Sequence, residues 1–297
     1  MAKEHSGREL WERMQEFVAQ DDGLPCYDCG SWTLHKLFFL CQYLATTTQA
    51  IVGNPKFSSV NYVDMFAGNG VCRLRDEEGR RPRYAGSAML AAGCRKPFDN
   101  VFVVEREAEN VQALQERLRR LGAQSKIKVF QGDANAEVTA VASAIPDRSL
   151  TVAFVDPFSL DVHFASVAAL ASARPLDLII LFADAMDIAR NVEEYYYPKR
   201  SDKLDLFLGS QSNWRAGWDR LTDRSGYSCR RFFGNCYLSQ LTRLGYRHTR
   251  IRPIQSDLGQ PLYSLVYASK HPLGLKFWDI ASHEDLGGNR GLWPGAV

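Results

Sequence analysis

The sequence of 297 residues has no long hydrophobic run and almost no net charge. Apolar-rich stretches, such as residues 37–40 and 176–183, are far shorter than the roughly 20 residues that cross a bilayer. With 36 basic and 34 acidic residues the formal charge is +2, so net charge alone indicates no nucleic-acid or membrane partner. The apolar share of 45% and the charged share of 24% are those of an ordinary globular protein, which excludes a disordered or collagen-like chain.

Other absences exclude further classes of protein. The seven cysteines are odd in number and scattered, so they do not form the regular pattern of a disulfide scaffold. The polar start, Met1 to Ser6, is not followed by an apolar stretch of signal-peptide length. These two observations predict a cytoplasmic protein. The chain also lacks a Gly-x-x-x-x-Gly-Lys-Ser/Thr loop, which disfavours a P-loop enzyme.

Strand-like and helix-like segments alternate from residue 60 onward. Runs rich in β-branched and aromatic residues predict strands at 60–66, 101–105, 126–131, 150–155 and 176–182. Apolar residues at helical spacing predict helices at 108–121, 135–144 and 163–171. This alternation predicts an α/β fold in which helices cover both faces of a mostly parallel sheet. Its ligand site is expected at the carboxyl ends of the strands.

The remaining segments predict the domain organisation. Helices at 9–19 and from Ser31 or Thr33, as N-cap, to 44 predict an N-terminal helical extension over residues 1–55. A helical insertion is expected over 185–244, followed by an antiparallel pair of strands at 246–253 and 262–269. The core then comprises residues 56–184 and 245–297. The charged segment 73–83 is expected to be a solvent-exposed loop inserted in the first strand–helix unit.

Acidic residues occur at the ends of the first four predicted strands: Asp64, Glu105, Asp133 and Asp156. A carboxylate at the end of the second strand suits the two hydroxyls of a ribose, and one after the third suits the exocyclic amine of adenine. Any one of these acids could instead cap the next helix. Four acidic residues at equivalent strand ends favour one shared adenosine site. Gly68 and Gly70 would let the backbone approach the ligand.

Asp64 discriminates among adenosine compounds. Its carboxylate would repel a pyrophosphate but attract the α-ammonium of an amino acid. The dinucleotide motif needs a third glycine where this chain has Arg73. The pattern therefore favours S-adenosylmethionine over NAD or ATP. The residues expected to hold the cofactor are Asp64, Phe66, Ala67, Gly68, Gly70, Glu105, Asp133, Ala134 and Asp156.

The turn Asp156-Pro157-Phe158 after the fourth strand predicts the acceptor side of the site. A carboxylate beside an aromatic face suits a planar, amino-bearing group, because the acid accepts N–H bonds while the ring stacks. The turn is similar to the Asp-Pro-Pro-Tyr turn of amino-group methyltransferases, with one proline and with phenylalanine for tyrosine. The alternative is a structural turn with Phe158 buried. Lys36, expected over the site on an N-terminal helix, completes the catalytic candidates Asp156, Pro157, Phe158 and Lys36.

Several of these segments, in order along the chain, resemble the three-Cys-motif partner (TcmP) family. They are residues 63–70, Gly86-Ser87, residues 154–158, Leu262-Tyr263 and residues 268–272, together with Trp32-Thr33, Lys36 and Tyr43. The resemblance implies a methyltransferase-like fold and a partner protein with a three-cysteine motif that looks like a radical S-adenosylmethionine enzyme. With the residue evidence, it predicts a Rossmann-like class I methyltransferase fold. The expected activity is S-adenosylmethionine-dependent methyl transfer to an unidentified acceptor.

Two alternative functions stay open. Residues 214–252 carry nine arginines against two aspartates, with aromatic residues interleaved. Such a segment either docks nucleic acid for base N-methylation or combines core aromatics with solvated arginines. The other alternative is a non-catalytic, cofactor-binding scaffold subunit of the three-Cys-motif partner.

A metal site is not predicted. Cys26-x-x-Cys29 is a single ligand pair, whereas structural zinc sites usually combine two such pairs. His35 and Cys41, six residues apart on a predicted helix, would point in different directions. Unpaired structural thiols are therefore the expected role of these cysteines.

Overall fold

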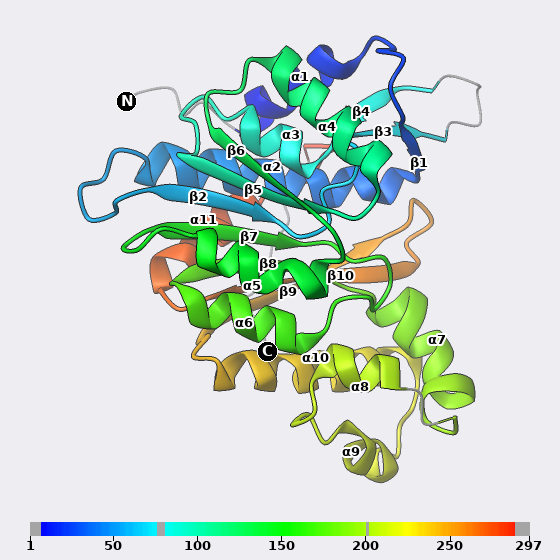
Figure 1. The fold of residues 1–297 in the computed structure, drawn as a ribbon. Helices are drawn as coiled ribbons and strands as arrows, with labels where there is room; N and C mark the ends of the chain where they lie inside the picture. The colour runs from blue at the N-terminus through cyan, green and yellow to red at the C-terminus, as the bar shows by residue number, and fades with distance from the viewer. Residues whose placement is uncertain (1–6, 76–80, 200–201, 289–297) are drawn as a thin grey trace.

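The structure, a computed structural model, describes residues 7–75, 81–199 and 202–288 (Figure 1). Its centre is a seven-stranded sheet in the order β6-β5-β2-β7-β8-β10-β9. The strands, in chain order, are β2 (Val60–Asp64), β5 (Asn100–Glu105), β6 (Lys126–Gln131), β7 (Leu150–Val155), β8 (Leu176–Phe182), β9 (His248–Gln255) and β10 (Pro261–Ser269).

The strand order defines the fold class. Strands β6, β5, β2, β7 and β8 run parallel, whereas β10 is antiparallel to both of its neighbours, β8 and β9. This is the arrangement of the Rossmann-like class I methyltransferase fold, so the predicted fold class is confirmed. The chain proceeds from β2 to one side of the sheet and later returns to β7 on the other side. A ligand crevice is expected at that switch in direction.

Helices cover both faces of the sheet (Figure 1). On one face lie α2 (Ser31–Ile51), α3 (Ser87–Ala92), α4 (Ala108–Leu121) and α11 (Pro272–Ala281), with α1 (Gly7–Val18) packed on α2. On the other face lie α5 (Ala134–Ala144), α6 (Phe164–Ala173) and α10 (Gly226–Arg243). Every residue of β2 and β8 is buried, as expected for strands covered on both sides. None of the described helices is long and apolar enough to span a membrane.

Two expectations from the sequence differ from the structure. Helix α2 is capped by Gly30, rather than Ser31 or Thr33, and runs seven residues beyond the predicted end, to Ile51. Of the loop expected at 73–83, Arg75, Arg81 and Pro82 are exposed and outside any strand, but its two ends belong to β3 (Val71–Leu74) and β4 (Arg83–Ala85), which pair antiparallel. Strand β1 (Tyr27–Cys29) pairs with β3 in a second, three-stranded sheet. Strands of three or four residues are too short to show an alternating pattern in the sequence.

Arg83 explains why β4 is not solvent-exposed. Its side chain is buried and donates hydrogen bonds to Asp21 and Asp22. These partners lie about 60 residues away in the sequence, so local charge could not indicate the burial. Residues 76–80 of the segment lie outside the described residues.

The segment after β8 is helical, as expected. It forms η1 (Asp184–Ile188), α7 (Ala189–Asn191), η2 (Val192–Tyr196), α8 (Asp202–Leu208), α9 (Trp214–Arg220) and α10. Trp214 and Trp218 are buried and pack against Phe233. Two arginines of this segment form ion pairs, Arg215 with Asp205 and Arg224 with Glu193. The tryptophans are therefore core residues, as one of the two interpretations held, and their rings cannot stack on bases.

Candidate cofactor site

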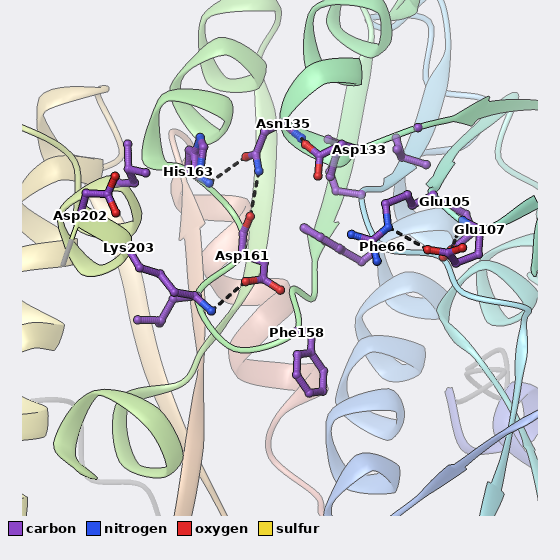
Figure 2. A pocket seen from close by; sticks show the side chains of 17 residues that line it. Phe66, Glu105, Glu107, Asp133, Asn135, Phe158, Asp161, His163, Asp202 and Lys203 are labelled. Carbon is purple, nitrogen blue, oxygen red and sulfur yellow. Dashed lines mark hydrogen bonds and ion pairs between the residues drawn. The ribbon is translucent and has the colours of Figure 1, made fainter. Parts of the chain in front are cut away.

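A cavity of about 630 Å³ opens at the carboxyl ends of β2, β5, β6 and β7 (Figure 2). The loops after these four strands line it, and α8 closes one side. Five acidic and two basic side chains face it, and both basic ones are ion-paired: Arg106 to Glu107 at 2.8 Å and Lys203 to Asp161 at 2.9 Å. The cavity therefore favours a cationic ligand over a phosphate-bearing one.

Glu105, at the end of β5, lines the cavity with its carboxylate held in place. One oxygen accepts the Gly68 N–H at 2.9 Å, and the other accepts the Glu107 N–H at 2.8 Å and the Asn110 side chain at 3.3 Å. A carboxylate offers about four acceptor positions. Glu105 therefore keeps capacity for a ligand hydroxyl while its orientation is fixed by the protein.

Asp133 combines the two roles that the sequence left open. It is the N-cap of α5, with Oδ1 accepting the N–H groups of Asn135 at 2.9 Å and Ala136 at 3.3 Å. It also lines the cavity. Both of these bonds use Oδ1, so Oδ2 is left to accept from a ligand.

Asn135 organises the opposite wall of the cavity (Figure 2). Its amide donates to the Asp161 carbonyl at 2.8 Å, and its side-chain oxygen accepts the His163 N–H at 2.8 Å. Asn135 thereby ties the loop after β7 to the start of α5. No local pattern indicates a role for Asn135, because its hydrogen-bond partners follow a different strand.

Asp64 does not have the position that the sequence predicted for a ligand contact. Its side chain is fully buried; Oδ1 accepts the Phe66 N–H at 3.3 Å, and Oδ2 accepts the Tyr62 hydroxyl at 3.1 Å. Burial raises the pKa of Asp64 to about 7. A buried carboxyl that is half protonated near neutrality is a poor partner for a ligand ammonium. Asp64 instead holds the loop that follows β2.

The glycines of that loop make close contacts within the protein. Gly68 has φ +61° and donates its N–H to Glu105. Gly70 has φ +86°, and a Cβ there would lie 2.8 Å from Leu114 and 3.1 Å from Met89. Its backbone conformation and the close packing of Leu114 and Met89 therefore require glycine at position 70.

The predicted cofactor residues divide into two groups. Those that line the cavity are Phe66, Glu105, Asp133 and Ala134. Those that are not part of its lining are Asp64, Ala67, Gly68, Gly70 and Asp156. Ala67 is buried and donates its N–H to the Val104 carbonyl at 3.0 Å, so it fastens the loop to β5.

Phe158 lies at the rim of the cavity (Figure 2). The residue is 86% exposed, which contradicts the alternative of a buried ring, whereas Pro157 is buried. The next residue, Ser159, has φ +62° and donates its hydroxyl to Asp187 of η1. This contact, which the sequence did not indicate, anchors the loop to the helical insertion.

Lys36 and Asp156 meet beside the cavity. The Lys36 ammonium lies 2.8 and 2.6 Å from the two carboxylate oxygens of Asp156. The side chains are only 13% and 18% exposed. Helix α2 thus carries Lys36 to the end of β7, and the Tyr263 ring lies 5.8 Å from its ammonium.

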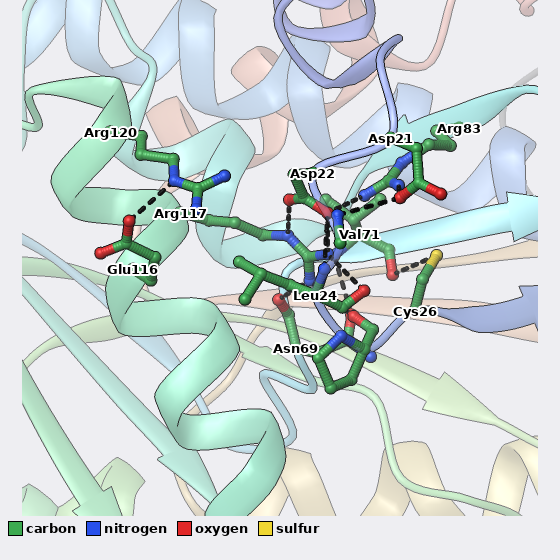
Figure 3. Close-up of polar contacts among 12 residues, drawn as sticks. Asp21, Asp22, Leu24, Cys26, Asn69, Val71, Arg83, Glu116, Arg117 and Arg120 are labelled. Carbon is green, nitrogen blue, oxygen red and sulfur yellow. Dashed lines mark hydrogen bonds and ion pairs between the residues drawn. The ribbon is translucent and has the colours of Figure 1, made fainter.

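A buried arginine forms hydrogen bonds with the loop after β2 (Figure 3). Arg117 of α4 is 2% exposed, binds Asp22 at 2.7 Å, and donates to the carbonyls of Asn69 at 2.7 Å and Pro25 at 2.9 Å. Although burial opposes ionisation, hydrogen bonds from Arg117 and Arg83 hold the pKa of Asp22 below its ordinary value. Arg117 of α4 therefore links the segment before β1 to the loop after β2.

The cysteines show no metal-binding arrangement in the described part of the chain. No three or more histidine, cysteine, aspartate or glutamate side chains are grouped there to hold an ion. Cys41 is buried, and its thiol donates to the Gly7 carbonyl at 3.3 Å.

Fold and cavity together define a Rossmann-like α/β protein with an acidic ligand cavity at the switch in strand order. The chain matches no model of a protein family, and no curated protein is similar to it in sequence.

Solved structures with a similar backbone are distant in sequence. Protein LPL1258 from Legionella pneumophila is 10% identical, with a TM-score of 0.48 over 81% of this chain and 89% of the other. A putative O-methyltransferase from Klebsiella pneumoniae is 12% identical, with a TM-score of 0.45 over 89% of each chain. An O-methyltransferase from Bacillus cereus in complex with SAH is 11% identical, with a TM-score of 0.44 over 91% and 93%. These likenesses are too weak to carry function, which rests on the site itself.

Proposed function

We propose that the protein is an S-adenosylmethionine-dependent methyltransferase. The observation that carries the proposal is the acidic cavity at the switch in strand order, with Glu105 and Asp133 facing it from consecutive strand ends. A ribose diol suits Glu105, and the adenine amine suits Oδ2 of Asp133.

The charge of the lining supports this ligand over a dinucleotide or ATP. A phosphate in the cavity would face an excess of carboxylates, and both lining cations are already ion-paired. S-adenosylmethionine has the adenosine group, bears a positive sulfur and carries no phosphate. Its charge therefore suits the lining.

When bound, the cofactor supplies a methyl group that is already activated on sulfur. The protein's part is to bind, orient and exclude water, and such positioning can account for much of a rate enhancement. Phe66 and Phe158, on neighbouring loops, line the cavity where the donor and acceptor would meet. The exposed Phe158 ring offers a stacking surface for a planar acceptor.

Calorimetry with S-adenosylmethionine, S-adenosylhomocysteine and NAD tests the proposal. The first two are expected to bind, and Glu105→Gln should weaken both about tenfold, since hydrogen bonds to a charged acceptor contribute roughly 1.5–3 kcal/mol. Glu109→Gln, an exposed acid in the first turn of α4, is the matched control. Binding of NAD without any response to the other two ligands would overturn the assignment.

Membership of the TcmP family and association with a three-Cys-motif protein belong to the same proposal. Support comes from the resembling segments, because residues 63–70 form the end of β2 and its loop, and residues 154–158 include the cavity rim. Co-purification with such a partner tests the association. Two results together would favour a scaffold subunit instead. The wild type would transfer no methyl group to any fraction of a cell extract, and the Asp156→Ala variant would still bind the partner.

A further inference from the structure

The order of groups along the sheet edge points to a role for the Lys36–Asp156 pair. Strand order places Asp133 after β6, Glu105 at the end of β5, Phe66 after β2 and Asp156 after β7. Neighbouring strands lie about 4.8 Å apart, so these positions extend over about 14 Å along the edge. S-adenosylmethionine extended along them places adenine at Asp133, ribose at Glu105, sulfur at Phe66 and its amino-acid end at Asp156.

The surroundings of Asp156 are consistent with that position. Strand β7 ends beside the loop that carries Phe66, because the Met65 N–H donates to the Phe154 carbonyl at 3.1 Å. Phe158, two residues after Asp156, lines the same cavity as Phe66. Asp156 therefore lies next to the cavity, on the side away from Glu105 and Asp133.

The pair has the charges that an amino acid requires. We infer that Lys36 and Asp156 form the binding site for the amino-acid end of the cofactor, with Lys36 taking its α-carboxylate and Asp156 its α-ammonium. Each protein charge exchanges one partner for another of the same sign, so no charge is left unpaired in a site where both side chains are largely buried.

Asp64 cannot take this part. Its side chain is 0% exposed, whereas those of Lys36 and Asp156 are 13% and 18% exposed. The inference rests on the proposed function, since it assigns the remaining end of the same ligand. It gives Asp156 a contact with the cofactor rather than with the acceptor.

The test compares S-adenosylhomocysteine with 5′-methylthioadenosine, which lacks the amino-acid end, by calorimetry. Lys36→Met and Asp156→Asn should each weaken the first ligand tenfold or more and change the second less than about twofold. Lys203→Met is the matched control. It removes an ion-paired lysine from another part of the cavity wall and should change both ligands by the same factor.

A charge-swapped variant distinguishes ligand binding from a purely structural latch. Lys36→Glu combined with Asp156→Lys retains opposite charges but reverses those offered to the ligand. Its thermal midpoint should return toward that of the wild type while S-adenosylhomocysteine binding stays weak; recovery of binding would overturn the inference.

Failure of the inference and failure of the proposed function are distinguishable. If S-adenosylhomocysteine binds the wild type but its preference over 5′-methylthioadenosine is unchanged in both single variants, only the inference is wrong. If neither adenosine compound binds the wild type, both are wrong.

Discussion

The buried carboxyl of Asp64 makes the stability of the protein depend on pH in a direction that can be calculated. Burial raises its pKa from 3.8 to about 7. The folded protein therefore binds more protons than the unfolded chain between these pH values, and stability falls as pH rises through that window. A shift of about 3 pKa units corresponds to ~4 kcal/mol, all of it lost above pH 7.

Asp64→Asn should remove this dependence. The amide keeps the volume of the side chain, and its oxygen still accepts the Phe66 N–H, but it carries no charge at any pH. The variant is expected to be more stable than the wild type at pH 8 and close to it at pH 4.5. The difference between the two free energies of unfolding should grow by ~3 kcal/mol across this range, because the first part of the ~4 kcal/mol is already lost below pH 4.5.

Urea unfolding followed by tryptophan fluorescence at pH values from 4.5 to 8.5 measures that difference. The buried Asp184, whose pKa burial raises to about 6, titrates in both proteins and cancels in the comparison. Asp257→Asn, in the exposed turn between β9 and β10, is the control and should follow the wild type. A wild type and an Asp64→Asn variant separated by the same free energy at every pH would refute the reasoning.

Three further substitutions test the remaining parts of the site. Arg117→Met should lower the free energy of unfolding by roughly 3–5 kcal/mol, because Asp22 loses a buried partner; a loss below about 1 kcal/mol in a denaturant titration would contradict this. Asp133→Ser should keep the cap of α5 and leave stability within about 0.5 kcal/mol. The same variant should weaken S-adenosylhomocysteine binding about tenfold, and unchanged binding in calorimetry would remove Asp133 from the site. Phe158→Ala should leave stability within about 0.5 kcal/mol because the ring is exposed. It should also slow transfer of labelled methyl groups into a cell extract, and an unchanged rate would argue against stacking.

Much of the fold is readable from local pattern. Helix α4 and strands β6, β7 and β8 have the bounds expected from periodicity, because each contains a continuous apolar face or a buried run. The small sheet of β1, β3 and β4 was missed, since its short strands are held by contacts such as that between Arg83 and Asp22.

The candidate site likewise has residues that local sequence predicts correctly and residues that it misplaces. Placing Glu105 and Asp133 at consecutive strand ends needed only the alternation of strands and helices, and both line the cavity. The same pattern put Asp64 in that group, although it is buried beneath its own loop. Position along a strand is local information, whereas the direction in which a side chain meets solvent depends on what packs over it.

Hydrophobic period and turn chemistry act over a few residues, so the order of strands and helices and the acidic strand ends could be predicted from the amino-acid sequence alone. The three-dimensional structure was needed to show which acids face the cavity, that Phe158 is exposed, and that Lys36 meets Asp156, 120 residues away. Those outcomes depend on how layers of the fold pack together, because burial and ion pairing join residues that no local pattern relates.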